Sequence, residues 1–128
     1  MTKRVLDVGQ CGADHASIRA LIEGRFDAEV VQAHGARETV EALRDGHFDL
    51  VLINRKLDRD ASDGVDIIRQ VKADTHLADV PIMLVSNYAE HQEVAVGAGA
   101  EPGFGKAELD KAETQAKLRA VLASHGER

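Results

Sequence analysis

The sequence predicts an α/β fold, a doubly wound five-stranded parallel sheet with five helices in a three-layer sandwich. Short apolar runs of strand length alternate with longer stretches whose apolar residues recur at helical spacing. The connections are short, so each strand is joined to the next through a helical crossover, which requires parallel strands covered on both faces. No repeat or linker interrupts the 128 residues, so we expect one domain over residues 1–128.

The first half of the chain predicts three strands and two helices. Glycines close most of these segments, and Asp14 is expected to cap the first helix through its side-chain oxygen. In each helix, apolar residues spaced three or four apart form one face. The expected strands cover residues 5–8, 28–33 and 48–53, and the expected helices cover residues 14–24 and 36–46.

The second half predicts three helices and two strands. Asp63 and Gly64 begin the third helix, and Pro81 is acceptable only at the start of the fourth strand. Two glycines weaken the fifth strand, and the polar residues 125–128 are expected to fray. The expected strands cover residues 80–85 and 103–105, and the expected helices begin at 63 and cover 88–97 and 109–124.

The third strand leads directly into Asn54, which is followed by a charged loop. In open α/β sheets, ligands and chemistry gather at the carboxyl ends of the strands. Asn54 therefore stands where this fold would be expected to act. Its side chain is a neutral amide, which is neither an ion nor a nucleophile.

Composition narrows the possible functions. The net charge is −6 with no block of basic residues, which disfavours direct nucleic-acid binding by this domain. No segment reaches the ~20 apolar residues needed to cross a bilayer, and the first residues form a poor signal peptide. The single cysteine, Cys11, cannot form an internal disulfide and is interpreted as a plain thiol. Together these features predict a cytoplasmic protein without a membrane partner.

Over nearly its whole length the chain resembles the receiver domains of two-component response regulators. Residues 48–53 are similar to the strand that delivers the phosphoacceptor aspartate, and residues 63–68 to the Asp-Gly step into the third helix. Residues 80–86 resemble the fourth strand with its switch hydroxyl, and residues 95–100 the small-residue segment before strand five. Lys106 lies where the family keeps a lysine. The resemblance implies a flavodoxin-like fold with strand order 2-1-3-4-5.

The same resemblance implies a degenerate site, as in a pseudo-receiver. The phosphoacceptor position is Asn54, and the acidic Mg²⁺-binding pair corresponds to Gly9 and Gln10. Phosphoryl transfer needs an anionic nucleophile and a cation, and Mg²⁺ prefers carboxylate oxygens. We therefore expect no phosphorylation at Asn54, no metal or other cofactor, and no catalytic residue; the protein is not expected to be an enzyme.

Two pocket residues of the family are retained, Ser86 and Lys106. The aromatic switch position of strand five is Gly103, and Phe104 should point to the opposite face. The proline that usually follows the lysine is replaced by Ala107. Lys106 is expected to donate to the Asn54 side-chain oxygen; a sharper alternative is an anion site formed with Ser86, Asn54 and the amides of residues 9–12.

Asp7 is unusual because it lies inside the first strand, where the family usually has an apolar residue. A buried carboxylate has a raised pKa unless it is paired. A buried ion pair or a register shift in the first strand is favoured over a substitute for the missing acidic residues.

The function predicted from these features is a phosphorylation-independent signalling module of the receiver type. In the family, helix four, strand five and helix five carry the contacts with output proteins or a second copy. Here that face corresponds to residues 88–97, 103–105 and 109–124. The alternative function is a sensor of a small molecule or anion that uses the emptied pocket around Lys106.

Overall fold

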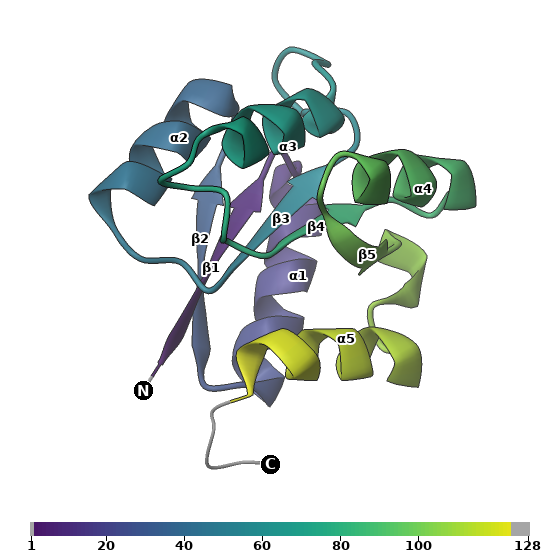
Figure 1. The fold of residues 1–128 in the computed structure, drawn as a ribbon. Coiled ribbons are helices and arrows are strands. Elements are labelled where there is room, and N and C mark those ends of the chain that lie inside the picture. The colour runs from purple at the N-terminus through teal and green to yellow at the C-terminus, as the bar shows by residue number, and fades with distance from the viewer. Residues whose placement is uncertain (1, 124–128) are drawn as a thin grey trace.

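The computed structural model describes residues 2–123, in which five parallel strands form one sheet with helices on both faces (Figure 1). The hydrogen-bonded order is β2-β1-β3-β4-β5, so the predicted order is confirmed. The strands are β1 (Lys3–Val8), β2 (Ala28–Ala33), β3 (Leu50–Asn54), β4 (Ile82–Val85) and β5 (Glu101–Phe104). The helices are α1 (Gly12–Arg25), α2 (Ala36–Asp45), α3 (Gly64–Ala73), α4 (Ala89–Gly97) and α5 (Ala112–Leu122).

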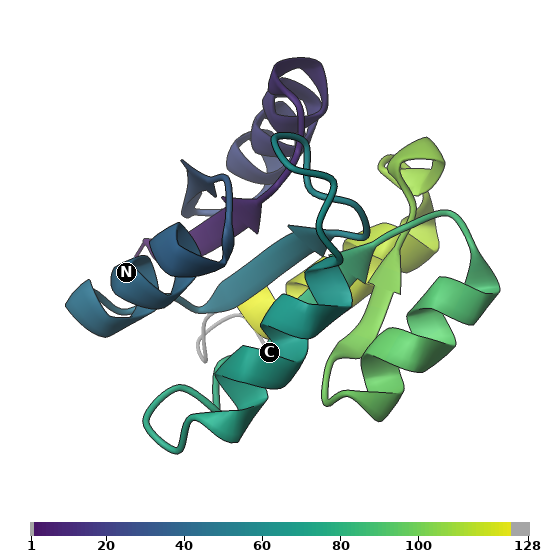
Figure 2. The same cartoon turned by 90° about the horizontal axis from the view of Figure 1, so that it is seen from above.

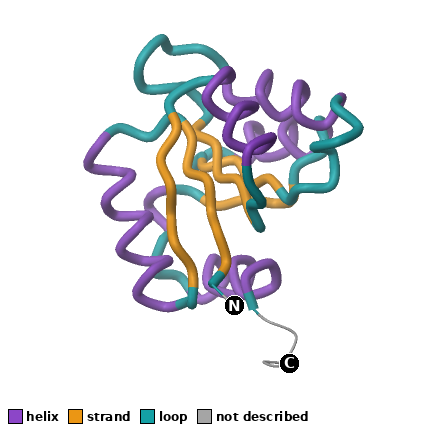
Figure 3. Tube along the Cα trace, turned by 90° about the vertical axis from the view of Figure 1, so that its left-hand side faces the viewer, coloured by secondary structure: helices purple, strands orange, loops and turns teal. Residues whose placement is uncertain are grey.

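Each face of the sheet has its own hydrophobic core, because successive strand residues point to opposite sides. Leu6 and Val8 belong to the cluster beneath α2, α3 and α4, whereas Val5 belongs to the cluster beneath α1 and α5. Figure 2 shows the helices on opposite sides of the sheet, and Figure 3 shows the strands between them. The central strand β3 is buried on both faces from Leu50 to Ile53, and Asn54 is the last residue at its carboxyl end.

Several element boundaries differ from the prediction. Helix α1 begins at Gly12 with Cys11 as its N-cap, and no side chain caps it, so the predicted Asp14 cap is wrong. Strand β3 begins two residues late because the Asp49 carboxylate accepts the Arg4 N–H at 2.8 Å. Helix α5 begins after a separate 3-10 turn, Lys106–Glu108. The predicted frayed tail, residues 125–128, lies outside the described residues.

The fifth strand, which two glycines were expected to weaken, does form, although it begins earlier than predicted, at Glu101. It lies at the edge of the sheet, where a proline such as Pro102 is tolerated. Its pairing with β4 shifts register between Met83 and Val85. The side chain of Gln92, from α4, bridges the two strands near this irregularity.

Candidate functional site

The predicted site residues lie at the carboxyl edge of the sheet, but they do not all meet. A pocket of about 330 Å³ is lined by Asn54, Ser86 and Lys106 from the ends of three strands, together with parts of the following loops. Gly9 and Gln10 follow β1 and do not line this pocket. The predicted anion site therefore does not include the backbone amides of residues 9–12. Only the side chains of Asn54, Ser86 and Lys106 remain from that prediction.

The Asn54 amide is fixed by two backbone carbonyl groups. Its Nδ2 donates to the carbonyl oxygen of Lys56 at 2.8 Å and to that of Gly9 at 3.2 Å. Carbonyl oxygens only accept, so the nitrogen, and not the oxygen, of the amide must face them. A carboxylate at this position could satisfy neither carbonyl group. The side chain thus connects the end of β3 to the end of β1.

The loop after β3 also covers Gly9 directly. Asp58 donates its backbone N–H to the Gly9 carbonyl at 3.0 Å, and the buried Leu57 packs against the Gly9 Cα. Gly9 has φ +75°, and a Cβ there would overlap the Leu57 side chain. In Figure 2 this loop extends from β3 toward β1 and α1. A side chain at position 9 would therefore require both a strained backbone and movement of the loop.

These residues do not fit the Mg²⁺ ion that the resemblance implies. Gly9 supplies no side chain, its carbonyl group already accepts two N–H donors, and Asn54 directs its nitrogen into the site. Mg²⁺ is usually held through one or two carboxylates. Within residues 2–123, no group of three or more His, Cys, Asp or Glu side chains is arranged to hold a metal ion.

Lys106 does not donate to Asn54, so that prediction is wrong. Its Nζ lies 2.7 Å from Oδ2 of Asp14 in α1. The hydrogen bond from Lys106 holds the pKa of the Asp14 carboxyl below its usual value. Both side chains are about one-third exposed, so this is a partly solvated ion pair rather than a buried charge. Lys106 is thereby drawn toward α1 at the rim of the pocket.

Ser86 is bound to the start of α4. Its Oγ lies 2.8 Å from Nδ1 of His91 and accepts the Tyr88 N–H at 3.3 Å. The Tyr88 ring meets the His91 ring edge-on, with 5.1 Å between centroids. The Ser86 hydroxyl is therefore already engaged by α4.

Gly103 has a steric reason to lack a side chain. A Cβ at this position would overlap the carbonyl oxygen of Leu84. Gln92 accepts the Gly103 N–H at 2.9 Å and donates to the carbonyl oxygens of Leu84 and Ser86 at 2.9 and 3.1 Å. Phe104 is buried with the α1 and α5 cluster on the opposite face, as its alternation with Gly103 predicted. The Gln92 amide thus occupies the side of β5 that a side chain at position 103 would face.

The Ala107 N–H donates to the Asn87 side-chain oxygen at 3.2 Å, a contact that proline could not make. The same oxygen would overlap a Cβ at Gly105. The loops after β4 and β5 are therefore joined through Asn87. The replacement of the usual proline by Ala107 has a structural role here.

Asp7 is buried and paired with His15, a contact that is an ion pair only when the imidazole is protonated. The regular pairing of β1 with both neighbours shows no register shift. Its Oδ2 lies 2.7 Å from Nδ1 of His15, while its Oδ1 has no hydrogen-bond partner. Burial raises the pKa of the Asp7 carboxyl to about 6, and His15 and Lys106 act against the rise. Gln10 is likewise fully buried, with both amide atoms unpartnered. This polar cluster lies beneath the site, toward α1.

The electrostatics of the pocket favour negative charge. Arg55, Lys56 and Lys106 line it, and no Asp or Glu does. Arg55 lies 3.3 Å from Asp63 beyond the pocket, and Lys106 is paired with Asp14. The pocket is therefore cationic, with two of its three charges partly balanced from outside.

Sequence reasoning missed five residues that shape the site: Asp14, His15, Leu57, His91 and Gln92. Gln92 lies one turn before the buried Ala95, so it falls on the inner face of α4, where a polar side chain needs partners. That spacing was a usable signal. No comparable pattern marked Leu57, because an apolar residue in a charged loop has several possible contacts.

Comparisons with solved structures identify the fold. The signal receiver domain of a DNA-binding response regulator from Colwellia psychrerythraea 34H has a TM-score of 0.79 at 18% identity, covering 95% of this chain and 99% of that one. A putative response regulator from Chloroflexus aurantiacus J-10-fl has a TM-score of 0.78 at 16% identity, covering 97% and 100%. The receiver domain of the Francisella response regulator 1452 has a TM-score of 0.77 at 14% identity, covering 94% and 97%.

At these identities the likeness shows the fold, which is that of response-regulator receiver domains. No protein-family model matches the chain, and no curated protein matches it. Among the helices of residues 2–123, none is long and apolar enough to cross a membrane.

Proposed function

We propose that this protein is a receiver-like signalling module that binds another protein without being phosphorylated, and that it is not an enzyme. One observation carries the proposal: Asn54 Nδ2 is hydrogen-bonded to the Gly9 carbonyl, at the position of the missing acidic pair. Contacts between neighbouring loops at a position where phosphoryl transfer would need a nucleophile and a metal ion support the proposal. We place its action in the cytoplasm, where its single exposed cysteine would remain a thiol.

The surface proposed for the partner, or for a second copy, is the face formed by α4, β5 and α5. Tyr88, Val94 and Val96 are 62%, 50% and 44% exposed, and all three lie in α4 or at its N-cap. A groove of about 370 Å³ beside them is lined in part by Val96, Pro102 and Lys117. Val96 lines this groove, so an exposed apolar side chain on this face supports a protein interface there.

The module is proposed to hold a single conformation. Ser86 is engaged by His91, and Gln92 joins α4 to both β4 and β5. These contacts oppose independent movement of α4 relative to the strands. Binding would then depend on the concentration of the partner rather than on a chemical signal.

The test is a quantitative pull-down with the wild type, a Val94→Ser/Val96→Ser double variant and an Ala20→Ser control on exposed α1. Each is measured with and without acetyl phosphate and Mg²⁺, and self-association is followed by sedimentation velocity. The proposal expects binding that the double variant loses, the control keeps and acetyl phosphate does not alter. Binding that requires acetyl phosphate would contradict it.

A second candidate function is an anion sensor, and a specific observation favours it. The pocket beside Asn54 is lined by three cationic side chains and by no carboxylate. Phosphate and sulfate, compared with chloride at equal ionic strength, should raise the melting temperature if anions bind there. Lys56→Met should abolish that rise, whereas Lys111→Met, an exposed lysine outside the pocket, should not. An absent or unselective shift would exclude the sensor.

A further inference from the structure

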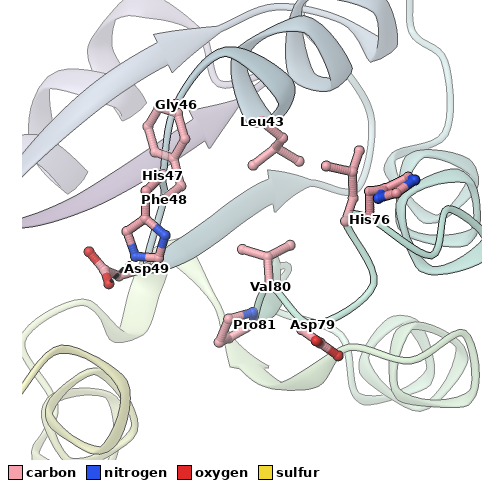
Figure 4. Close-up of a pocket in the computed structure, with 10 residues that line it drawn as sticks. Leu43, Gly46, His47, Phe48, Asp49, His76, Asp79, Val80 and Pro81 are labelled. Atoms are coloured by element: carbon pink, nitrogen blue, oxygen red, sulfur yellow. Dashed lines mark hydrogen bonds and ion pairs between the residues drawn. The ribbon is translucent and has the colours of Figure 1, made fainter.

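A second hollow lies at the opposite edge of the sheet from Asn54, where β3 and β4 begin (Figure 4). We call it the amino-edge pocket; its volume is about 390 Å³. One wall is the segment between α2 and β3, and the other is the segment between α3 and β4. A volume of this size accommodates a small organic ligand.

The interior of the amino-edge pocket is apolar. Phe48 and Leu77 are 6% and 8% exposed, and Leu43 and Val80 pack against the same hydrophobic cluster from the rim. Figure 4 shows Leu43 and Val80 on facing walls of the opening. An apolar group placed between them would extend the core of the protein and lose its contact with water.

Both walls are held in place by long cationic side chains that do not line the pocket. Arg4 donates Nη1 to the His47 carbonyl at 3.1 Å, and its guanidinium lies 4.3 Å from the centre of the Phe48 ring. On the other wall, Lys72 donates Nζ to the carbonyl oxygens of Ala78 and Val80 at 2.8 and 2.7 Å. The pocket is therefore formed before any ligand arrives, which reduces the entropic cost of binding.

The rim of the pocket carries two carboxylates. Asp49 and Asp79 line the pocket together with His47 and His76, and no Lys or Arg does. Burial acts to raise the pKa of Asp49, but hydrogen bonds from Arg4 and His47 outweigh it and hold that pKa below its usual value. Asp79 is exposed at the edge of the opening. Two carboxylates beside an apolar floor are complementary to a cation that carries an apolar group.

We propose that the amino-edge pocket binds a small organic cation, with an aromatic ring or branched chain between Leu43 and Val80 and its positive group toward Asp79. This site is separated from the Asn54 pocket by the length of the strands, and it does not depend on the proposed signalling function. A ligand bound in the amino-edge pocket would change the structure at the ends of α2 and α3. The last turns of these helices are joined by a hydrogen bond of 2.8 Å from Nη2 of Arg44 to Oδ2 of Asp74.

Three probes of matched shape test the proposal: benzamidine, neutral benzamide and anionic benzoate. Each is titrated into ¹⁵N-labelled protein at pH 8. Benzamidine should shift the amides of residues 43–49 and 76–80, with a dissociation constant of about 1–10 mM, ordinary for so small a ligand. It should bind about fivefold more tightly than benzoate, because single exposed charge pairs contribute modestly.

Variants separate charge from shape. Asp79→Asn should weaken benzamidine about two- to fivefold, whereas Asp45→Asn, an exposed carboxylate outside the pocket lining, should not. Val80→Phe should block all three probes, provided that its spectrum shows a folded protein. Equal binding of benzamidine and benzoate, shifts outside these two segments, or equal effects of Asp79→Asn and Asp45→Asn would overturn the proposal.

Discussion

Replacing Asn54 by aspartate should destabilise the protein rather than restore a phosphorylation site. Asn54 Nδ2 donates to two carbonyl oxygens, at 2.8 and 3.2 Å. Asn54→Asp removes both hydrogen bonds, each worth about 1 kcal/mol, and turns a carboxylate toward two carbonyl oxygens. Of these, the Gly9 carbonyl keeps only the Asp58 N–H as its donor. We expect the free energy of unfolding at pH 7 to fall by about 2–4 kcal/mol.

Urea denaturation of the wild type, Asn54→Asp and Asn54→Ala measures this effect. Alanine loses the hydrogen bonds without adding a charge, so it should cost about 1–2 kcal/mol. With a slope of about 1–3 kcal/mol per molar urea, the aspartate variant should unfold about 1–2 M earlier than the wild type. Lowering the pH should reduce the difference in the free energy of unfolding between Asn54→Asp and Asn54→Ala, because a protonated carboxyl group can again donate a hydrogen bond.

The reasoning is refuted if Asn54→Asp is as stable as the wild type at pH 7. It is also refuted if the aspartate variant is more stable than Asn54→Ala, since the carbonyl groups of Gly9 and Lys56 would then not be the partners that matter.

Three further predictions concern the residues around the site. Gly9→Asp should lower the free energy of unfolding, measured by urea denaturation, by about 3 kcal/mol or more, because φ is +75° and the new Cβ would overlap Leu57. The control is Gly12→Ala, which has open space around it and should be neutral or stabilising. Gln92→Ala removes three hydrogen bonds between α4, β4 and β5 and should cost about 2–3 kcal/mol, with faster amide hydrogen exchange in β5. The raised pKa of Asp7, about 6 against an ordinary 3.8, means that ionisation costs stability as the pH rises from about 4 to 6. The stability of Asp7→Asn relative to the wild type should therefore increase with pH over that range, by at most about 3 kcal/mol.

Each of these has a contrary outcome. A Gly9→Asp variant of wild-type stability would mean that the loop carrying Leu57 moves aside easily. Unchanged hydrogen exchange in β5 after Gln92→Ala would show that the edge strand does not need this side chain. A stability difference for Asp7→Asn that is constant, or that falls as the pH rises, would contradict the raised pKa.

The fold could be predicted from the sequence because its signals are local. Alternating apolar runs located all five strands and five helices, and the resemblance supplied the order of the sheet. The ends of strands were less predictable where a side chain, instead of a backbone carbonyl group, accepts the hydrogen bond of a backbone N–H. Asp49 binds the Arg4 N–H and delays the start of β3, and nothing in the spacing of residues 48–53 indicates this.

The site was predictable in position but not in its contacts. Asn54, Ser86 and Lys106 meet at the carboxyl edge as the strand pattern indicated. The partner of Lys106 was wrong because Asp14, 92 positions away, was assigned to a helix cap. A flexible lysine side chain selects among carboxylates by distance in three dimensions, and that distance is not encoded in the spacing along the chain.

The central claim is that Asn54 and its surroundings do not take up a phosphoryl group. The most direct measurement is the intact mass of the protein after incubation with acetyl phosphate and Mg²⁺, beside a receiver domain that retains all its acidic residues. The account predicts an unchanged mass for this protein while the comparison domain gains one phosphoryl group. A Mg²⁺-dependent gain of one phosphoryl group here, lost on removal of the metal, would contradict it.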